Sequence, residues 1–223
     1  FMLTLAPKAK VEASAYTPKD IVFVVDRSGS MAENGKMDQA RKALKHCVER
    51  LDPRDRFGLV DFGTGVESME SRLLSGTPEN RARAVRYIDG IEPSGGTNIE
   101  GGLREGLSLL GRAEGRVPMM FFITDGVPTA GQTDVTQLLR IATDANSALK
   151  ARLFSFGVGS DVNTLLLDKL AEGNGGARDY VGPGEEIEGK VSSLYAKIAK
   201  PALTDVKVSW EGVEPSSVYP RPI

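Results

Sequence analysis

Apolar segments of strand length alternate along this chain with segments in which apolar residues recur at helical spacing. The strand-like runs lie at 21–25, 56–62, 117–124, 152–158 and 178–181. The run at 117–124 is apolar without alternation, which is typical of a parallel strand covered on both faces. The helical spacing predicts helices at 36–51, 77–88, 99–110, 132–149, 162–172 and 185–199.

This order of elements predicts an α/β fold with a doubly wound, mostly parallel central sheet between two layers of helices, Rossmann-like in layout. We expect about six strands. A short run at 66–69 follows the turn residues Gly63-Thr64-Gly65 and predicts one antiparallel edge strand. In such sheets a ligand lies beyond the carboxyl ends of the strands, where the strand order reverses. If the strands at 21–25 and 117–124 are neighbours there, Asp26 and Asp125 converge.

Helical spacing also assigns faces to particular side chains. Thr77 resembles an N-cap, and its helix is predicted to carry Ala82, Val85 and Ile88 inward. Cys47 falls on the apolar face of its helix, which favours a buried core thiol over a reactive one.

His46 lies about half a turn from the apolar face of the same helix and should face solvent. It is the only histidine, so a histidine-based triad is excluded unless this exposed residue is the base.

Composition narrows the classes of function. The chain has 223 residues, a net charge of −2 and interspersed charges, so nothing favours nucleic acid or a polybasic membrane contact. Its apolar runs are too short to cross a membrane, and a single cysteine excludes an internal disulfide and a cysteine-based zinc site.

The start at Phe1 suggests a piece of a longer protein. We expect a lead-in strand or linker at 1–17, one domain at 18–200, and an exit segment at 201–223 that holds a strand at 204–210.

Five oxygen-bearing side chains stand in the loops at the predicted ligand edge: Asp26, Ser28, Ser30, Thr97 and Asp125. Hard oxygen donors without imidazole or thiolate suit Mg²⁺ or Mn²⁺ rather than zinc or copper. Because the hydroxyls are neutral, two carboxylates at most cancel the charge of a divalent ion. A metal held there would stay electrophilic and could accept a carboxylate from a partner.

Other interpretations of these residues stay open at this point. The serines and Asp125-Gly126 could be plain turn formers. Gly157-Val158-Gly159 lacks the third glycine of a dinucleotide loop, so nucleotide binding is weakly supported. Asp26 could also be the nucleophile of a Mg²⁺-dependent phosphoryl-transfer enzyme; however, the haloacid dehalogenase-like enzymes of similar layout carry a second Asp where this chain has Ser28.

The motifs carry a family resemblance. Asp26-Arg27-Ser28-Gly29-Ser30-Met31, Ser94-Gly95-Gly96-Thr97 and Ile123-Thr124-Asp125-Gly126 resemble the three loops of the metal-ion-dependent adhesion site (MIDAS) of von Willebrand factor type A (VWA) domains. The resemblance covers roughly residues 18–200. The segments at 1–7 and 201–206 are similar to those of inter-alpha-trypsin inhibitor heavy chain-like proteins and their bacterial relatives.

The resemblance implies a non-enzymatic, metal-dependent protein-binding or cell-adhesion domain. In such a domain the hydroxyls of Ser28, Ser30 and Thr97 bind Mg²⁺, with Mn²⁺ or Ca²⁺ as alternatives, and Asp26 and Asp125 bind it directly or through water. A sixth position takes a Glu or Asp side chain of a protein ligand. The resemblance favours an extracellular, cell-surface or periplasmic location, and we expect a monomer.

Two further expectations depend on the same family. Its members use the last helix, here 185–199, as a mobile element coupled to the site. Arg27 departs from the small or apolar residue that often stands between the Asp and the first Ser. If Arg27 points outward, it adds a cationic contact for an acidic partner and leaves metal affinity unaffected.

Overall fold

The computed structural model describes residues 16–112, 114–182, 185 and 189–190. The predicted lead-in segment up to residue 15, the exit segment at 201–223 and most of the predicted helix at 185–199 lie outside these ranges.

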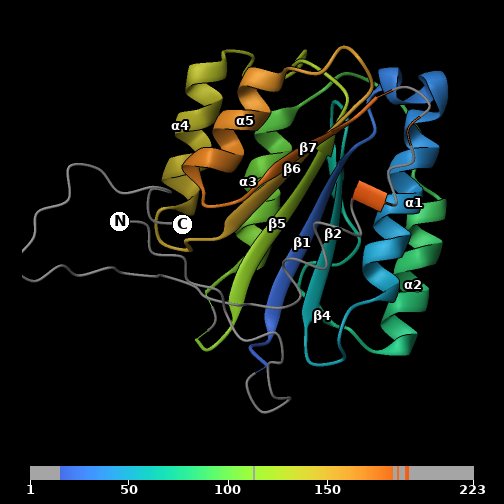
Figure 1. Ribbon diagram of the computed structural model, residues 1–223, viewed down its shortest axis with the longest axis vertical. Helices are drawn as coiled ribbons and strands as arrows, with labels where there is room; N and C mark the ends of the chain where they lie inside the picture. Colours follow the sequence, from blue (N-terminus) through green and yellow to red (C-terminus); the bar gives the residue numbers. More distant parts are fainter. Residues whose placement is uncertain (1–15, 113, 183–184, 186–188, 191–223) are drawn as a thin grey trace, which may run out of the picture.

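A twisted sheet forms the centre of the domain (Figure 1). Its strand order is β3-β2-β1-β5-β6-β7, with β4 also paired to β2. Strands β1, β2, β5, β6 and β7 are parallel, whereas β3 and β4 run antiparallel to β2. The bounds are β1 Lys19–Asp26, β2 Arg56–Phe62, β3 Val66–Ser68, β4 Leu74–Ser75, β5 Val117–Thr124, β6 Arg152–Val158 and β7 Arg178–Val181.

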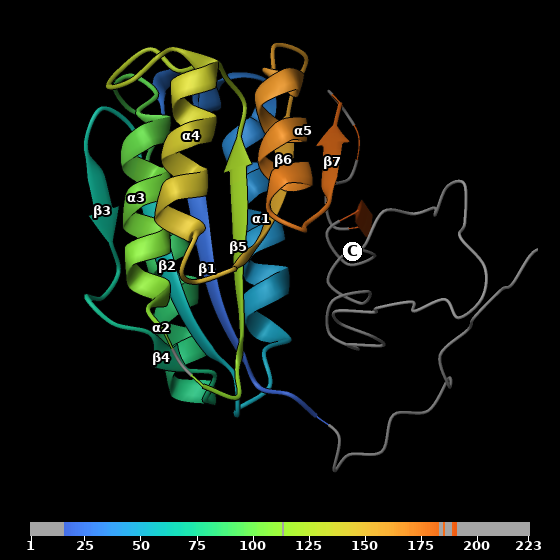
Figure 2. The same ribbon diagram turned by 90° about the vertical axis from the view of Figure 1, so that its left-hand side faces the viewer.

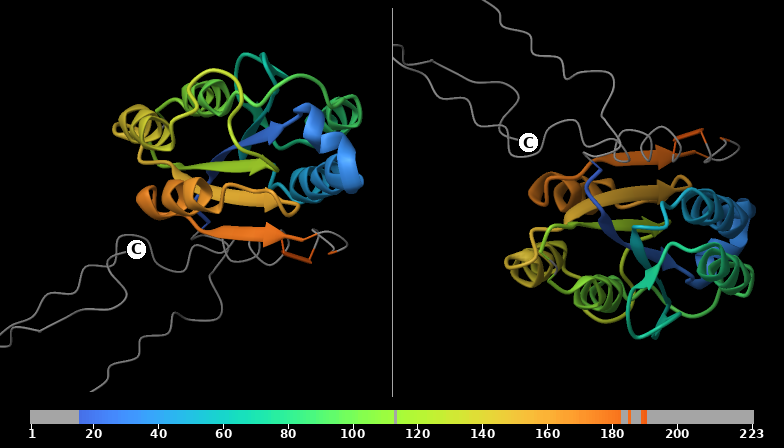
Figure 3. Two further views of the ribbon diagram at one scale, coloured as in Figure 1. Left: turned by 90° about the horizontal axis from the view of Figure 1, so that it is seen from above. Right: turned by 90° about the horizontal axis from the view of Figure 1, so that it is seen from below.

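Helices cover both faces of the sheet, as Figures 2 and 3 show. Helices α1 and α2 pack on one face, and α3, α4 and α5 pack on the other. A 3₁₀ segment, η2 (Gly29–Gly35), connects β1 to α1. The helix bounds are α1 Lys36–Glu49, α2 Pro78–Asp89, α3 Ile99–Leu110, α4 Val135–Asn146 and α5 Thr164–Gly173.

Strand β1 divides the core into its two halves. Ile21, Phe23 and Val25 point to the α1/α2 side, and Val22 and Val24 point to the α3–α5 side. All five are at most 1% exposed. This double burial is the reason why the strand is apolar at every position from Ile21 to Val25.

The predicted doubly wound α/β class is therefore confirmed, with a few local differences. Strand β4 was not predicted, because two residues carry no periodic signal. In α2 the Thr77 cap is present, its hydroxyl accepting the Asn80 N–H at 3.4 Å.

The prediction of which residues form the inner face of α2, in contrast, was partly wrong. Ala84 and Ile88 are buried, Val85 is half-buried and Ala82 is exposed. Ala82 lies six positions before Ile88, about 120° away around the helix, so the two residues cannot share one face. Cys47 is buried in α1 as predicted. His46 is half-buried, with its ring nitrogen 2.9 Å from Arg50.

The strand order reverses between β1 and β5. The chain runs from β1 to β2 on one side, and β5 pairs with β1 on the other, with Val25 opposite Ile123. Asp26 and Asp125 therefore follow paired residues at the same edge of the sheet. This is the position where doubly wound sheets bind ligands.

Candidate functional site

Backbone hydrogen bonds join the loops that leave β1 and precede α3. The Gly29 N–H donates to the Gly95 carbonyl at 3.0 Å, and the Ser94 N–H donates to the Arg27 carbonyl at 2.6 Å. Gly95 has φ +76°, and a Cβ there would stand 2.7 Å from the Thr64 hydroxyl, so this turn needs glycine. The first two predicted loops are thus held together at the edge of the sheet.

Asp26 lies under these loops, with no exposed surface. Its Oδ1 accepts the Ser28 N–H at 2.7 Å, and its Oδ2 accepts the Thr124 hydroxyl at 2.5 Å. Burial raises the pKa of Asp26 to about 6, the two hydrogen-bonding neighbours lower it, and the charge of Asp125 raises it further. Asp26 is therefore a buried carboxylate whose hydrogen-bond partners are all neutral.

Three predicted residues form a direct hydrogen-bonded chain. The hydroxyl oxygens of Ser28 and Ser30 lie 3.1 Å apart, and the Ser30 hydroxyl donates to Asp125 Oδ1 at 2.9 Å. Ser28 and Asp125 are buried, whereas Ser30 is exposed. The cluster therefore reaches from the interior to the surface.

Thr97 completes the group from the second loop. The residue is 3% exposed, and in the part of the chain that the structure describes its hydroxyl has no hydrogen-bond partner. A Cβ placed on Gly126 would lie 3.9 Å from the Thr97 hydroxyl and 4.0 Å from that of Ser30. Both hydroxyls thus border the same space beside Gly126, and the structure brings all five predicted residues to one place.

A lysine that the sequence analysis did not single out belongs to the same cluster. The Lys36 ammonium donates to Asp125 Oδ2 at 2.7 Å, and both side chains are nearly inaccessible. The helical spacing held a signal for it, because Lys36 shares the face of Ala40, Ala43 and Cys47, all of which are buried.

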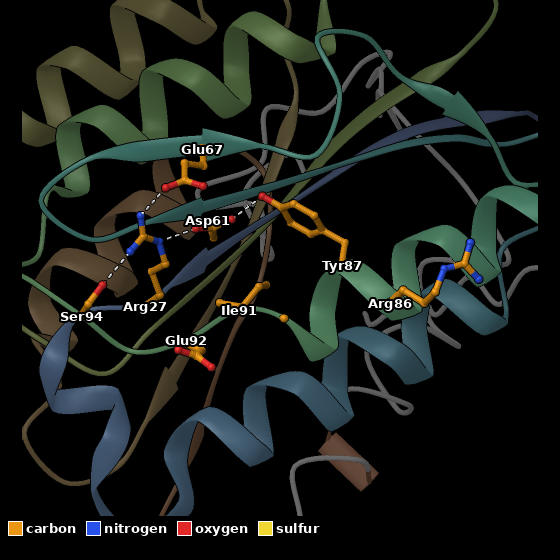
Figure 4. A pocket seen from close by; sticks show the side chains of 9 residues that line it. Arg27, Asp61, Glu67, Arg86, Tyr87, Ile91, Glu92 and Ser94 are labelled. Atoms are coloured by element: carbon orange, nitrogen blue, oxygen red, sulfur yellow. Dashed lines mark hydrogen bonds and ion pairs between the residues drawn. The ribbon is translucent and has the colours of Figure 1, made fainter.

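Arg27 does not point outward, which was the condition for its predicted contact with an acidic partner. Its guanidinium pairs with Asp61 at 2.5 Å and Glu67 at 2.8 Å, and donates to the Ser94 hydroxyl at 2.8 Å (Figure 4). Tyr87 donates to the other Asp61 oxygen. A buried carboxylate on β2 draws the arginine sideways, where it connects β2, β3 and the second loop.

This arginine network lines a cavity of about 370 Å³, whose lining side chains are drawn in Figure 4. Asp61 is 4% exposed, and burial raises its pKa despite the bonds from Tyr87 and Arg27 that lower it. All three nitrogens of the Arg27 guanidinium are bonded to other residues of the protein, so Arg27 itself offers no free donor to a ligand in this cavity.

The donor chemistry of the cluster fits a hard divalent cation. Its donors are carboxylate and hydroxyl oxygens, and it contains two buried carboxylates but only one ammonium, which pairs with Asp125. Within the described ranges no group of three or more His, Cys, Asp or Glu side chains could hold a metal, so any metal here would need the hydroxyls. Such a mixed set is compatible with Mg²⁺ or Mn²⁺.

The sheet order and the loop cluster at the reversal point define an α/β domain of the doubly wound class. The family model described as "von Willebrand factor type A domain" matches residues 20–183, and the chain belongs to this family.

Curated relatives include inter-alpha-trypsin inhibitor heavy chains. The human heavy chain H4 is 34% identical over 196 residues, which cover 85% of this chain and 21% of the relative. Heavy chain H1 from Sus scrofa is 33% identical over 201 residues, which cover 86% of this chain and 22% of the relative. The chain thus spans about a fifth of the length of these relatives.

Solved structures show the same fold. A von Willebrand factor type A protein from Catenulispora acidiphila superposes with a TM-score of 0.72 at 20% identity, over 81% of this chain and 42% of that one. The pilus adhesin SpaC from Lactobacillus rhamnosus GG gives a TM-score of 0.70 at 19% identity, over 86% and 32%. Across the described ranges, no helix has the length and apolar character that a membrane crossing requires.

Proposed function

We propose that this chain is a divalent-metal-dependent protein-binding domain with a metal-ion-dependent adhesion site. In this proposal Asp26, Ser28, Ser30, Thr97 and Asp125 hold Mg²⁺, with Mn²⁺ or Ca²⁺ as alternatives. The observation that carries the proposal is the convergence of two hydroxyls: that of Thr97, which has no hydrogen-bond partner among the described residues, borders the same space beside Gly126 as that of Ser30.

The partner would be a protein that presents a Glu or Asp side chain. A bound metal would supply a positive charge at the exposed end of the cluster, and the neutral hydroxyls there cancel none of it. Ser30 is exposed and Gly126 is partly exposed, so an incoming carboxylate could reach this end.

A binding role fits Asp26 better than a nucleophilic one. Both of its oxygens already accept a hydrogen bond, and the residue has no exposed surface. A nucleophile would have to present an oxygen to a phosphorus atom in line with the leaving group. We therefore propose a non-enzymatic interaction module.

The relatives guide the proposed setting. One structural neighbour is a pilus adhesin and another is described as an aerotolerance-related membrane protein. We propose that this domain, too, works outside the cytoplasm, at a cell surface, in an extracellular medium or in a periplasm, and that it binds proteins as a monomer.

Calorimetric titration of Mg²⁺ into chelator-treated protein tests the proposal. We expect wild type to bind Mg²⁺ and Thr97→Val to lose most of this affinity. The midpoint of unfolding of the variant should stay unchanged, because the removed hydroxyl has no hydrogen-bond partner among the described residues. Thr143→Val is the matched control, since it removes an exposed hydroxyl from α4 that bonds only to the Leu139 carbonyl. Absence of heat with wild type at millimolar Mg²⁺ would refute the proposed function.

A further inference from the structure

Lys36 places a fixed positive charge beside the proposed metal site. It is the first residue of α1 and is only 5% exposed. Its ammonium and the Asp125 carboxylate form an ion pair with side chains 7% and 0% exposed. Burial of this kind keeps solvent from screening the lysine charge.

The loop after β6 is shaped around the lysine stem. Gly159 has φ +98°, and a Cβ at this position would lie 2.8 Å from Lys36 Cε. A larger residue would therefore be strained by this φ and would require the lysine stem to shift. The ammonium is held between α1 and this loop.

Asp125 divides its two oxygens between opposite neighbours. Oδ2 accepts the Lys36 ammonium, and Oδ1 accepts the hydroxyl of Ser30. The hydroxyl cluster thus keeps one oxygen of the carboxylate, while the lysine cancels part of its charge through the other oxygen.

We propose that Lys36 makes the binding of the metal and the binding of an acidic partner depend on each other. This inference rests on the proposed function. With Asp26 and Asp125 ionised, the lysine leaves the empty cluster with one net negative charge. A divalent cation brings it to one net positive charge, and a partner carboxylate brings it to zero. Without the lysine, the metal alone would bring the net charge of the site to zero, and a partner carboxylate would make it negative. Lys36 is thus a positioning and specificity residue that weakens metal binding and strengthens carboxylate binding.

The test uses Lys36→Gln, which keeps a neutral hydrogen-bond donor, and Lys36→Met, which removes the donor as well. Titration calorimetry with Mg²⁺ and Mn²⁺ on chelator-treated protein should give dissociation constants at least about tenfold lower for both variants than for wild type, because a buried like charge is removed. Lys36→Arg should stay near wild type. Lys45→Met is the matched control, since it removes a lysine of the same helix that pairs at the surface with Asp89.

A second measurement uses acetate as the carboxylate probe at saturating Mn²⁺, followed by the water-proton relaxation of the bound ion. Acetate should bind Lys36→Gln about tenfold more weakly than wild type, by the same charge argument. Unchanged or weaker metal binding in both neutral variants, or equal acetate binding, would overturn the inference. If wild type itself binds no metal, the proposed function fails; if wild type binds and the neutral variants bind no more tightly, only this inference fails.

Discussion

Replacing Asp26 with asparagine should make the metal-free domain more stable while weakening its binding of metal. The asparagine fits the observed hydrogen bonds. Its carbonyl oxygen can accept the Ser28 N–H, and its amide can donate to the Thr124 hydroxyl oxygen once that hydroxyl rotates. The substitution therefore removes a buried charge without removing volume.

The magnitude follows from the pKa of Asp26, which burial raises from 3.8 to about 6. Each pKa unit corresponds to about 1.4 kcal/mol, so the ionised carboxylate costs the fold about 3 kcal/mol. Since the folded-state pKa lies above the unfolded value, the folded chain binds the extra proton between roughly pH 6 and pH 4. The contribution of Asp26 to stability is thus fully present below about pH 4 and is lost as the pH rises through about 6.

Urea denaturation in chelator, at pH 8, 6 and 4, measures the effect. We expect the free energy of unfolding of Asp26→Asn to exceed that of wild type by about 2 to 3 kcal/mol at pH 8 and to equal it near pH 4. Asp161→Asn, at an exposed position, should leave the free energy of unfolding unchanged at every pH. A variant less stable than wild type at pH 8, or a difference independent of pH, would refute the reasoning.

Arg27→Ala should lower the free energy of unfolding by about 2 kcal/mol, because it leaves Asp61 buried with Tyr87 as its only neighbour from the network. The affinity for Mg²⁺ should not change. An unchanged midpoint of urea denaturation would contradict the first expectation. Cys47 should react with an aromatic disulfide only at the rate of unfolding, since the thiol is 2% exposed and burial raises its pKa to about 12; a fast stoichiometric reaction in native buffer would show the thiol to be accessible.

Most of the fold could be predicted because its elements obey simple periodicities. The strands at 56–62 and 152–158 were placed with the observed bounds, since both are largely apolar and are buried at every position but the first. The inner face of α2 could not be fixed in the same way. A short helix with few large apolar residues gives several nearly equal apolar faces, and only packing against α1 selects Ala84.

Prediction of the candidate site depended on oxygen-bearing residues at the ends of strands, which the fold class alone brings to one edge. The directions of long side chains were beyond such reasoning. Arg27 turns toward Asp61, a residue on β2 that becomes its neighbour only through the sheet register. Lys36 turns inward because Asp125 lies 89 positions away in sequence but next to α1 in space.

The loops of the proposed site are held by backbone hydrogen bonds that require no metal, such as those from Gly29 to Gly95 and from Ser94 to Arg27. Metal binding then needs little loop ordering, and charge should govern the affinity. On this account, Asp26→Asn raises metal-free stability and weakens metal binding, whereas Lys36→Gln lowers metal-free stability and tightens metal binding. If loop ordering governed affinity instead, both variants would disturb the loops and lower both quantities. The opposite signs expected for the two variants therefore separate a site limited by charge from one limited by loop order.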